Sequence, residues 1–135
     1  MKKMMLWLIV GLVVALGAYI RLAPPDPAQW HVPPVGEVDR DEEGGVFRVV
    51  ETGPDSLARL DAIARATPRT SVLAGSVDEG MVTYVTRTKV IGFPDYTTVQ
   101  QDGDILRVYG RLRFGRRDFG VNRNRVDDWL SGLKL

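Results

Sequence analysis

Seventeen consecutive residues near the N-terminus, Met4 to Ile20, carry no charge. As an α-helix this run is about 25 Å long, close to the thickness of the hydrocarbon core of a bilayer. The helix would be apolar on every side, and a domain built from the rest of the chain is too small to surround it. We therefore expect residues 4–22 to form a membrane anchor and not a buried core helix.

A cleaved signal peptide is the alternative to an anchor. Lys2 and Lys3 followed by an apolar stretch fit a signal peptide, and Ala15–Gly17 is a small-x-small cleavage site. We favour the anchor, because the apolar run continues beyond that site. The two lysines favour a cytoplasmic N-terminus. The expected location is the cell membrane, with a single pass and the rest of the chain outside, which in a bacterium is the periplasm.

Residues 23–45 form a segment rich in proline and acidic residues, which we interpret as a linker. Its prolines favour a stiff, extended conformation. They are Pro24, Pro25, Pro27, Pro33 and Pro34. The acidic stretch Glu37–Glu43 leads into Gly44-Gly45, a pattern typical of a solvated hinge. We expect Trp30 either to rest at the membrane interface or to dock on the domain, and His31, the only histidine, to be a surface residue.

Residues 46–135 are enough for one domain with a modest core. Runs of β-branched and aromatic residues between turn-forming residues predict strands. The strands are expected over Val46–Glu51, Thr70–Val77, Met81–Ile91, Tyr96–Gln101 and Ile105–Phe114. Apolar residues at helical spacing predict helices over Pro54–Ala66 and Asn122–Leu133, the second capped by Asn122. The expected fold class is α+β, a small antiparallel sheet with two helices packed on one face, preceded by one transmembrane helix.

The last two strands form the clearest predicted hairpin, with Asp102-Gly103 as its two-residue turn. In that register Gln101 pairs with Asp104. Alternation along the second strand then assigns its residues to two faces. The core face is expected to carry Leu106, Val108, Leu112 and Phe114. The opposite face is expected to carry Arg107, Tyr109, Arg111 and Arg113, with Tyr96 and Thr98 of the first strand.

The sequence contains no set of residues that points to a known reaction. Because there is no cysteine, disulfides, thiolate metal sites and cysteine nucleophiles are excluded. Phosphate-binding glycine motifs, metal-ligand spacings and nucleophile–base pairs are also missing. We therefore expect no cofactor, metal or catalytic residue, and a binding or adaptor module is the leading hypothesis. The alternatives are an envelope hydrolase that uses carboxylates, with Asp95 and Asp118 as the residues to test, and a purely structural membrane protein.

Seven arginines and one acidic residue lie between Arg107 and Arg125, whereas the whole chain carries a net charge of only +1. Arginine binds phosphate or carboxylate through two parallel N–H bonds, so we predict an anion-binding surface. Its residues are Arg107, Arg111, Arg113, Arg116, Arg117, Arg123, Arg125, Tyr96 and Tyr109. The expected ligand is a lipid head group or an acidic protein partner beside the bilayer, and nucleic acid is not expected there. The alternative is a solvated sheet face with local ion pairs.

The stretch RLRFGRRDFGVNRNRV, Arg111–Val126, resembles the C-terminal signature of an uncharacterised bacterial and plastid family, domain of unknown function 1499. Members of that family show an arginine followed by G-x-x-D-x-G-x-N-R-x-R-V. The matching positions are Arg113, Gly115, Asp118, Gly120, Asn122, Arg123, Arg125 and Val126. Residues 67–75 and 92–99 also resemble recurring segments of the family. The resemblance implies a common fold unit and membrane association, but no known activity.

The same motif also predicts a tight corner between a strand and a helix. Gly115 and Gly120 allow the positive φ that such a connection needs. Asp118 is placed to pair with Arg113 or Arg123, or to accept backbone N–H groups in the turn. A structural corner, which includes Asn122 as the helix cap, is therefore the alternative to a ligand site.

Overall fold

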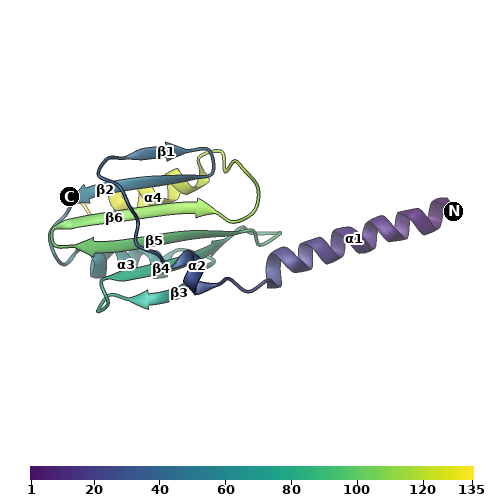
Figure 1. Ribbon diagram of the computed structural model, residues 1–135, viewed down its shortest axis with the longest axis horizontal. Coiled ribbons are helices and arrows are strands. Elements are labelled where there is room, and N and C mark those ends of the chain that lie inside the picture. The colour runs from purple at the N-terminus through teal and green to yellow at the C-terminus, as the bar shows by residue number, and fades with distance from the viewer.

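Six antiparallel strands form one sheet in the order β1-β2-β6-β5-β4-β3 (Figure 1). The computed structural model describes residues 1–135. The strands are β1 (Arg40–Glu42), β2 (Gly45–Glu51), β3 (Thr70–Ser76), β4 (Met81–Arg87), β5 (Pro94–Asp102) and β6 (Ile105–Leu112). The helices are α1 (Lys2–Leu22), α2 (Pro27–Trp30), α3 (Ser56–Ala66) and α4 (Val121–Ser131). The expected α+β class, with an N-terminal apolar helix, is confirmed.

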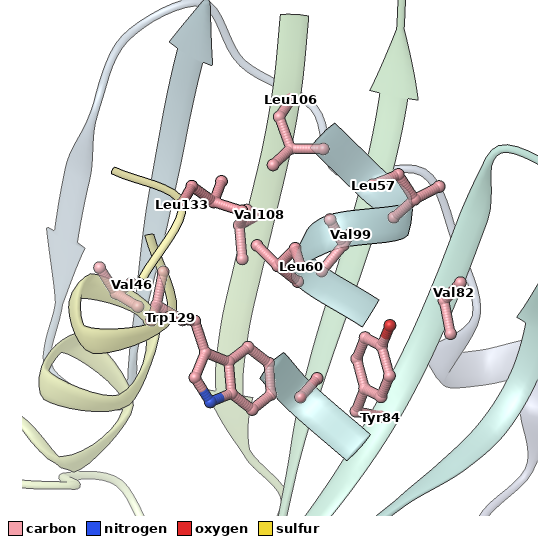
Figure 2. Close-up of a cluster of buried hydrophobic side chains, with 12 residues drawn as sticks. Val46, Leu57, Leu60, Val82, Tyr84, Val99, Leu106, Val108, Trp129 and Leu133 are labelled. Atoms are coloured by element: carbon pink, nitrogen blue, oxygen red, sulfur yellow. The ribbon is translucent and has the colours of Figure 1, made fainter. Parts of the chain in front are cut away.

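The main core lies between the sheet and the two helices α3 and α4, which pack on the same face (Figures 1 and 2). Its residues are Val46, Leu57, Leu60, Ala64, Val82, Tyr84, Val99, Leu106, Val108, Val126, Trp129 and Leu133. The rings of Tyr84 and Trp129 meet edge to face, with 5.6 Å between centroids. The polar groups of both rings are hydrogen-bonded, because the hydroxyl of Tyr84 donates to Asp61 and the indole N–H of Trp129 donates to Thr67.

The predicted hairpin is present, but its turn lies one residue later than expected. Gly103 and Asp104 are the central residues, and Asp102 pairs with Ile105. Gly103 has a φ of 60°, as a type II′ turn requires at its first central position. The pairing register shifts by two residues, one full period of a strand, so the side chains of β6 keep their predicted faces. Phe114, expected on the core face, lies beyond the end of β6 and contacts α1.

The strand β4 is shorter than expected because a tight loop follows it. It ends at Arg87 and not at Ile91. The hydroxyl of Thr88 accepts hydrogen bonds from the backbone N–H groups of Gly92 (3.1 Å) and Phe93 (2.8 Å). Gly92 also has a φ of 83°, which reverses the chain direction.

The helix α1 is long and apolar enough to cross a membrane, and Ile20 is its only buried residue. A signal sequence near an N-terminus has the same length and composition, so these properties do not distinguish the two. The cell membrane and the orientation of the helix therefore stay predictions.

Residues 23–39 cross the face of the sheet that α3 and α4 leave open (Figure 1). We call this segment the strap. Beneath it, Phe47, Thr83, Tyr96 and Thr98 are fully buried although neither α3 nor α4 covers them. The sheet therefore has two buried faces, one under the helices and one under the strap.

The prediction of a solvated hinge at Gly44-Gly45 is wrong. Gly45 is buried in β2, and Arg40–Glu42 form an additional strand that pairs with β2. A Cβ atom at Gly45 would lie 2.5 Å from the carbonyl oxygen of Gly110, so glycine is needed for the close approach of β2 and β6. The pattern that resembled a hinge is a tight turn between two paired strands.

Trp30 docks on the domain, which is one of the two positions expected for it. Its indole ring stacks on the ring of Tyr96, with 4.2 Å between centroids and 22° between planes. The short helix α2 that carries Trp30 is capped by Asp26, whose carboxylate accepts a hydrogen bond from the N–H of Ala28 (3.0 Å). This local cap fixes the direction from which Trp30 meets the sheet.

A chain of hydrogen bonds runs from the strap into the sheet. The Nδ1 atom of His31 lies 2.7 Å from the hydroxyl of Thr83, which lies 2.8 Å from the hydroxyl of Thr98. Thr98 donates its only hydrogen to the carbonyl of Trp30 (3.1 Å), so Thr83 donates to Thr98 and His31 donates to Thr83. His31 is thus a partly buried residue that holds the strap, and not the surface residue that was expected.

Removal of the strap should expose the second buried face of the sheet. We predict that the chain beginning at Ala23 unfolds cooperatively in urea. The chain beginning at Val46, which lacks both the strap and β1, should lose about 3 kcal/mol or more of unfolding free energy, because truncating a single buried aromatic side chain already costs that much. It should also bind a hydrophobic dye. Equal unfolding free energies for the two chains would show that the expected division between linker and domain at residue 46 is correct.

Candidate functional site at the α1 end of the domain

The helix α1 leaves the domain at one end of the sheet and contacts that end (Figure 1). The ring of Tyr19 lies edge-on to the ring of Phe114, with 6.0 Å between centroids. The side chain of Arg21 lies against Gly92. We call this end of the domain the α1 end. It is formed by the loops 67–69, 88–93 and 113–120 and the turn 43–44.

The two ends of the sheet carry opposite charge. Strand register places the turns 51–55, 77–80 and 101–104 at the far end, and these contain six acidic residues and no basic residue. The basic residues of the α1-end loops and of the adjoining end of β4 are Arg69, Arg87, Lys89, Arg113, Arg116 and Arg117. Glu43 and Asp118 are the acidic residues of the α1-end loops and turn, and Glu42 and Asp95 lie at the adjoining ends of β1 and β5. This separation of charge produces an electrostatic field that attracts anions to the α1 end.

Two predicted anion-binding residues, Arg107 and Tyr109, bind the chain's own acidic residues. Arg107 donates to the carbonyl of Gly36 (3.0 Å) and to both carboxylate oxygens of Glu37 (3.1 Å each). The hydroxyl of Tyr109 donates to Glu42 (2.7 Å). Burial, reinforced by that hydrogen bond, raises the pKa of Tyr109. Both residues therefore contact the segment that was interpreted as a linker.

Arg111, a third predicted residue, is buried beneath the strap without a carboxylate partner. It donates to the hydroxyl of Thr98 (2.9 Å), to the carbonyl of Tyr109 (3.0 Å) and to the carbonyl of Trp30. Its guanidinium carbon lies 5.4 Å from the ring centroid of Trp30 and 5.0 Å from that of Tyr109. Burial lowers the pKa of Arg111 to about 10, so it remains charged at neutral pH. Neutral acceptors and aromatic faces stabilise this charge.

The loop after β6 brings three of the predicted arginines together at the α1 end. Arg113 is partly buried and donates to the hydroxyl of Tyr96 (3.2 Å). Arg116 is exposed and has no side-chain partner. The guanidinium of Arg117 is exposed, and its acidic neighbour Glu43 lies 3.8 Å away. Two cations of this loop are therefore available to an outside anion.

The remaining predicted arginines lie on α4. Arg123 is exposed, 3.7 Å from Asp41. Arg125 points inward, and two of its guanidinium nitrogens lie 3.3 Å from one oxygen of Asp95. Burial raises the pKa of Asp95, and the charge of Arg125 offsets this only in part. The structure thus separates these two arginines from the exposed pair on the preceding loop.

Asp118 organises the corner between β6 and α4. One carboxylate oxygen accepts from the backbone N–H of Gly120 (3.0 Å), and the other accepts from the backbone N–H (3.1 Å) and the side-chain amide (2.9 Å) of Asn122. Gly115 and Gly120 have φ values of 93° and 81°. The helix begins at Val121 with Gly120 as its N-cap residue, so the expected cap at Asn122 is wrong. The carboxylate of Asp118 supplies the cap instead.

An apolar pocket of about 320 Å³ opens at the α1 end, beside this corner. Its apolar walls are Phe93, Leu112, Phe114, Phe119 and Val121. Its other lining residues are Thr88, Asp95, Gly115, Arg117 and Asp118. Sequence reasoning missed this pocket. The signal that could have revealed it was a pair of phenylalanines in a glycine- and arginine-rich loop, where no core requires them.

The pocket and the corner are built largely from the segment that carries the sequence resemblance. Residues 25–133 match the model of the family described as Protein of unknown function (DUF1499). The chain belongs to the DUF1499 family. No curated protein matches the sequence. Because the DUF1499 match begins within the strap, the family unit includes the segment that covers the second face of the sheet.

The capping role of Asp118 in this DUF1499 domain can be measured directly. We predict that Asp118→Ala lowers the unfolding free energy by about 2 kcal/mol, because the first turn of α4 loses its acceptors. Asp128→Ala is the matched control, since Asp128 is exposed on the same helix and makes no side-chain hydrogen bond. Urea denaturation checks both variants. Equal losses of unfolding free energy in the two variants would contradict the capping role.

The raised pKa of Asp95 predicts a pH dependence of stability. The folded chain holds this proton more tightly than the unfolded chain, so the stabilisation is present at low pH and is lost as the pH rises through the folded-state pKa. The unfolding free energy of the wild type minus that of Asp95→Asn should therefore decrease from about pH 3 to about pH 7. Urea unfolding across this range measures the difference. An increase would mean that Arg125 dominates and lowers the pKa.

Proposed function

We propose that this DUF1499 protein is a membrane-anchored binding module whose α1 end binds anionic lipid head groups beside its own anchor. The exposed cations of this end whose side chains make no hydrogen bond within the domain are Arg116, Arg117 and Lys89. The observation that carries the proposal is their position, on the loops that surround the exit of α1. The acidic turns lie at the opposite end of the sheet.

The contact between Tyr19 and Phe114 sets the depth of these loops relative to the bilayer. Tyr19 precedes the end of α1 by three residues, about 4.5 Å along the helix axis. If α1 spans a bilayer, Phe114 lies at the level of the last helical turn, where the head groups are. Each basic residue near an anionic surface contributes about 1 kcal/mol, so three engaged cations are enough to hold the domain against the bilayer.

The orientation that we propose follows from the N-terminal flank of α1. Lys2 and Lys3 favour a cytoplasmic N-terminus, which places the DUF1499 domain outside the cytoplasm. The two carboxylates of the hydrolase alternative, Asp95 and Asp118, line the same pocket, but both already have partners within the domain. The carboxylate of Asp118 is occupied by N–H groups of the α4 corner, and that of Asp95 is occupied by Arg125.

The chain has no cysteine, so a single introduced cysteine can report the position of the domain. Val90 is 79% exposed on the loop 88–93, and Val90→Cys can carry an environment-sensitive fluorophore. We predict a blue-shifted emission when the full chain is placed in nanodiscs that contain phosphatidylglycerol. The shift should diminish in phosphatidylcholine nanodiscs, at high salt, and in the variant Arg116→Ala with Arg117→Ala.

Two controls separate this effect from general changes. The variant Arg59→Ala with Lys134→Ala removes the same charge near the far end and should keep the shift. A fluorophore at Glu79→Cys, on a far-end turn, should report water in every nanodisc. Equal water exposure of positions 90 and 79 in anionic nanodiscs would contradict the proposed function.

A further inference from the structure

The apolar pocket at the α1 end lies where a bilayer would meet the domain. We infer that it binds an acyl chain of a membrane phospholipid that lies in the outer leaflet beside α1. This inference rests on the proposed function and names the part of the lipid that the site holds. The pocket volume of about 320 Å³ lies within the range of small-molecule sites.

Apart from Arg117, the polar side chains that line the pocket already have partners within the domain. The hydroxyl of Thr88 accepts two backbone N–H groups of its own loop. Asp95 is bonded by Arg125, and Asp118 by the first turn of α4. The rest of the lining is apolar, and an apolar ligand gains most from it.

The rim of the pocket carries side chains that a water-soluble domain has no reason to expose. Phe119 is 89% exposed, and its φ of 54° is rare for a residue other than glycine. Val121 lines the same rim, and Val90 and Ile91 are exposed on the loop 88–93, the segment that also supplies Phe93 to the pocket wall. Such an exposed apolar cluster marks an interaction site.

Continuity with α1 identifies the partner as lipid. Phe114 is shared between the pocket wall and the contact with Tyr19, so a chain in the pocket lies next to the end of the anchor helix. Arg117 and Phe119 also line an adjoining polar hollow of about 370 Å³, together with Glu43 and Gly120. An apolar pocket beside a polar hollow with an exposed arginine matches the chain and head group of one phospholipid.

The inference can be tested on the full chain in nanodiscs that contain a phospholipid with a diazirine on its acyl chain. After irradiation, mass spectrometry of the digested protein should find adducts on the pocket wall, at Leu112, Phe114 or Phe93, as well as on α1. Val121→Trp, which fills the rim with an indole ring, should reduce the pocket adducts at least fivefold. Val35→Trp, at an 81% exposed position on the strap that does not line the pocket, should leave them unchanged.

The outcomes separate this inference from the proposed function. Adducts on α1 alone, or pocket adducts that are equal in Val121→Trp and the wild type, would overturn the acyl-chain site even if the Val90→Cys probe shows docking. Pocket adducts and a Val90→Cys shift in anionic nanodiscs that are both unchanged in Arg116→Ala with Arg117→Ala would support the site and contradict head-group binding by arginine. A diazirine-bearing fatty acid that labels the pocket while the phospholipid does not would also overturn the inference.

Discussion

The docking of Trp30 on the sheet is the contact on which the rest of the architecture depends. Its ring stacks on Tyr96 and covers that ring. Its carbonyl accepts hydrogen bonds from the hydroxyl of Thr98 and from the buried guanidinium of Arg111. The strap that contains Trp30 converts an open two-layer fold into a sheet with two buried faces. It also fixes where α1 leaves the domain, and hence which loops lie beside the anchor helix.

This arrangement divides the arginines into two classes with different tasks. Arg107 and Arg111 hold the strap, and Arg125 holds the start of β5 through Asp95. Arg116 and Arg117, in the loop after β6, remain at the surface. A charge count along the chain cannot separate these classes, because the partners of the first class lie far away in the sequence. Arg107 and Glu37, for example, are 70 residues apart.

The elements with strong local signals were predictable, and those set by distant contacts were not. Alternation and helical periodicity predicted both packed helices, the hairpin and the faces of β6. The hairpin turn shifted because Gly103 suits the first position of a type II′ turn as well as the second of a type I′ turn. The strap was missed because its prolines and acids favour a solvated linker, and its docking depends on Tyr96 and Arg111 in remote strands. The pocket was missed because it exists only where two loops meet.

The proposed function, the charge asymmetry and the pocket share one claim, that the α1 end of the domain rests on the bilayer. Hydrogen–deuterium exchange of the full chain in anionic and in neutral nanodiscs tests this claim most directly. The account predicts slower exchange of the loops 88–93 and 113–120 in anionic nanodiscs, with unchanged exchange in the far-end turns 77–80 and 101–104. Identical exchange of all four segments in both lipids would contradict it.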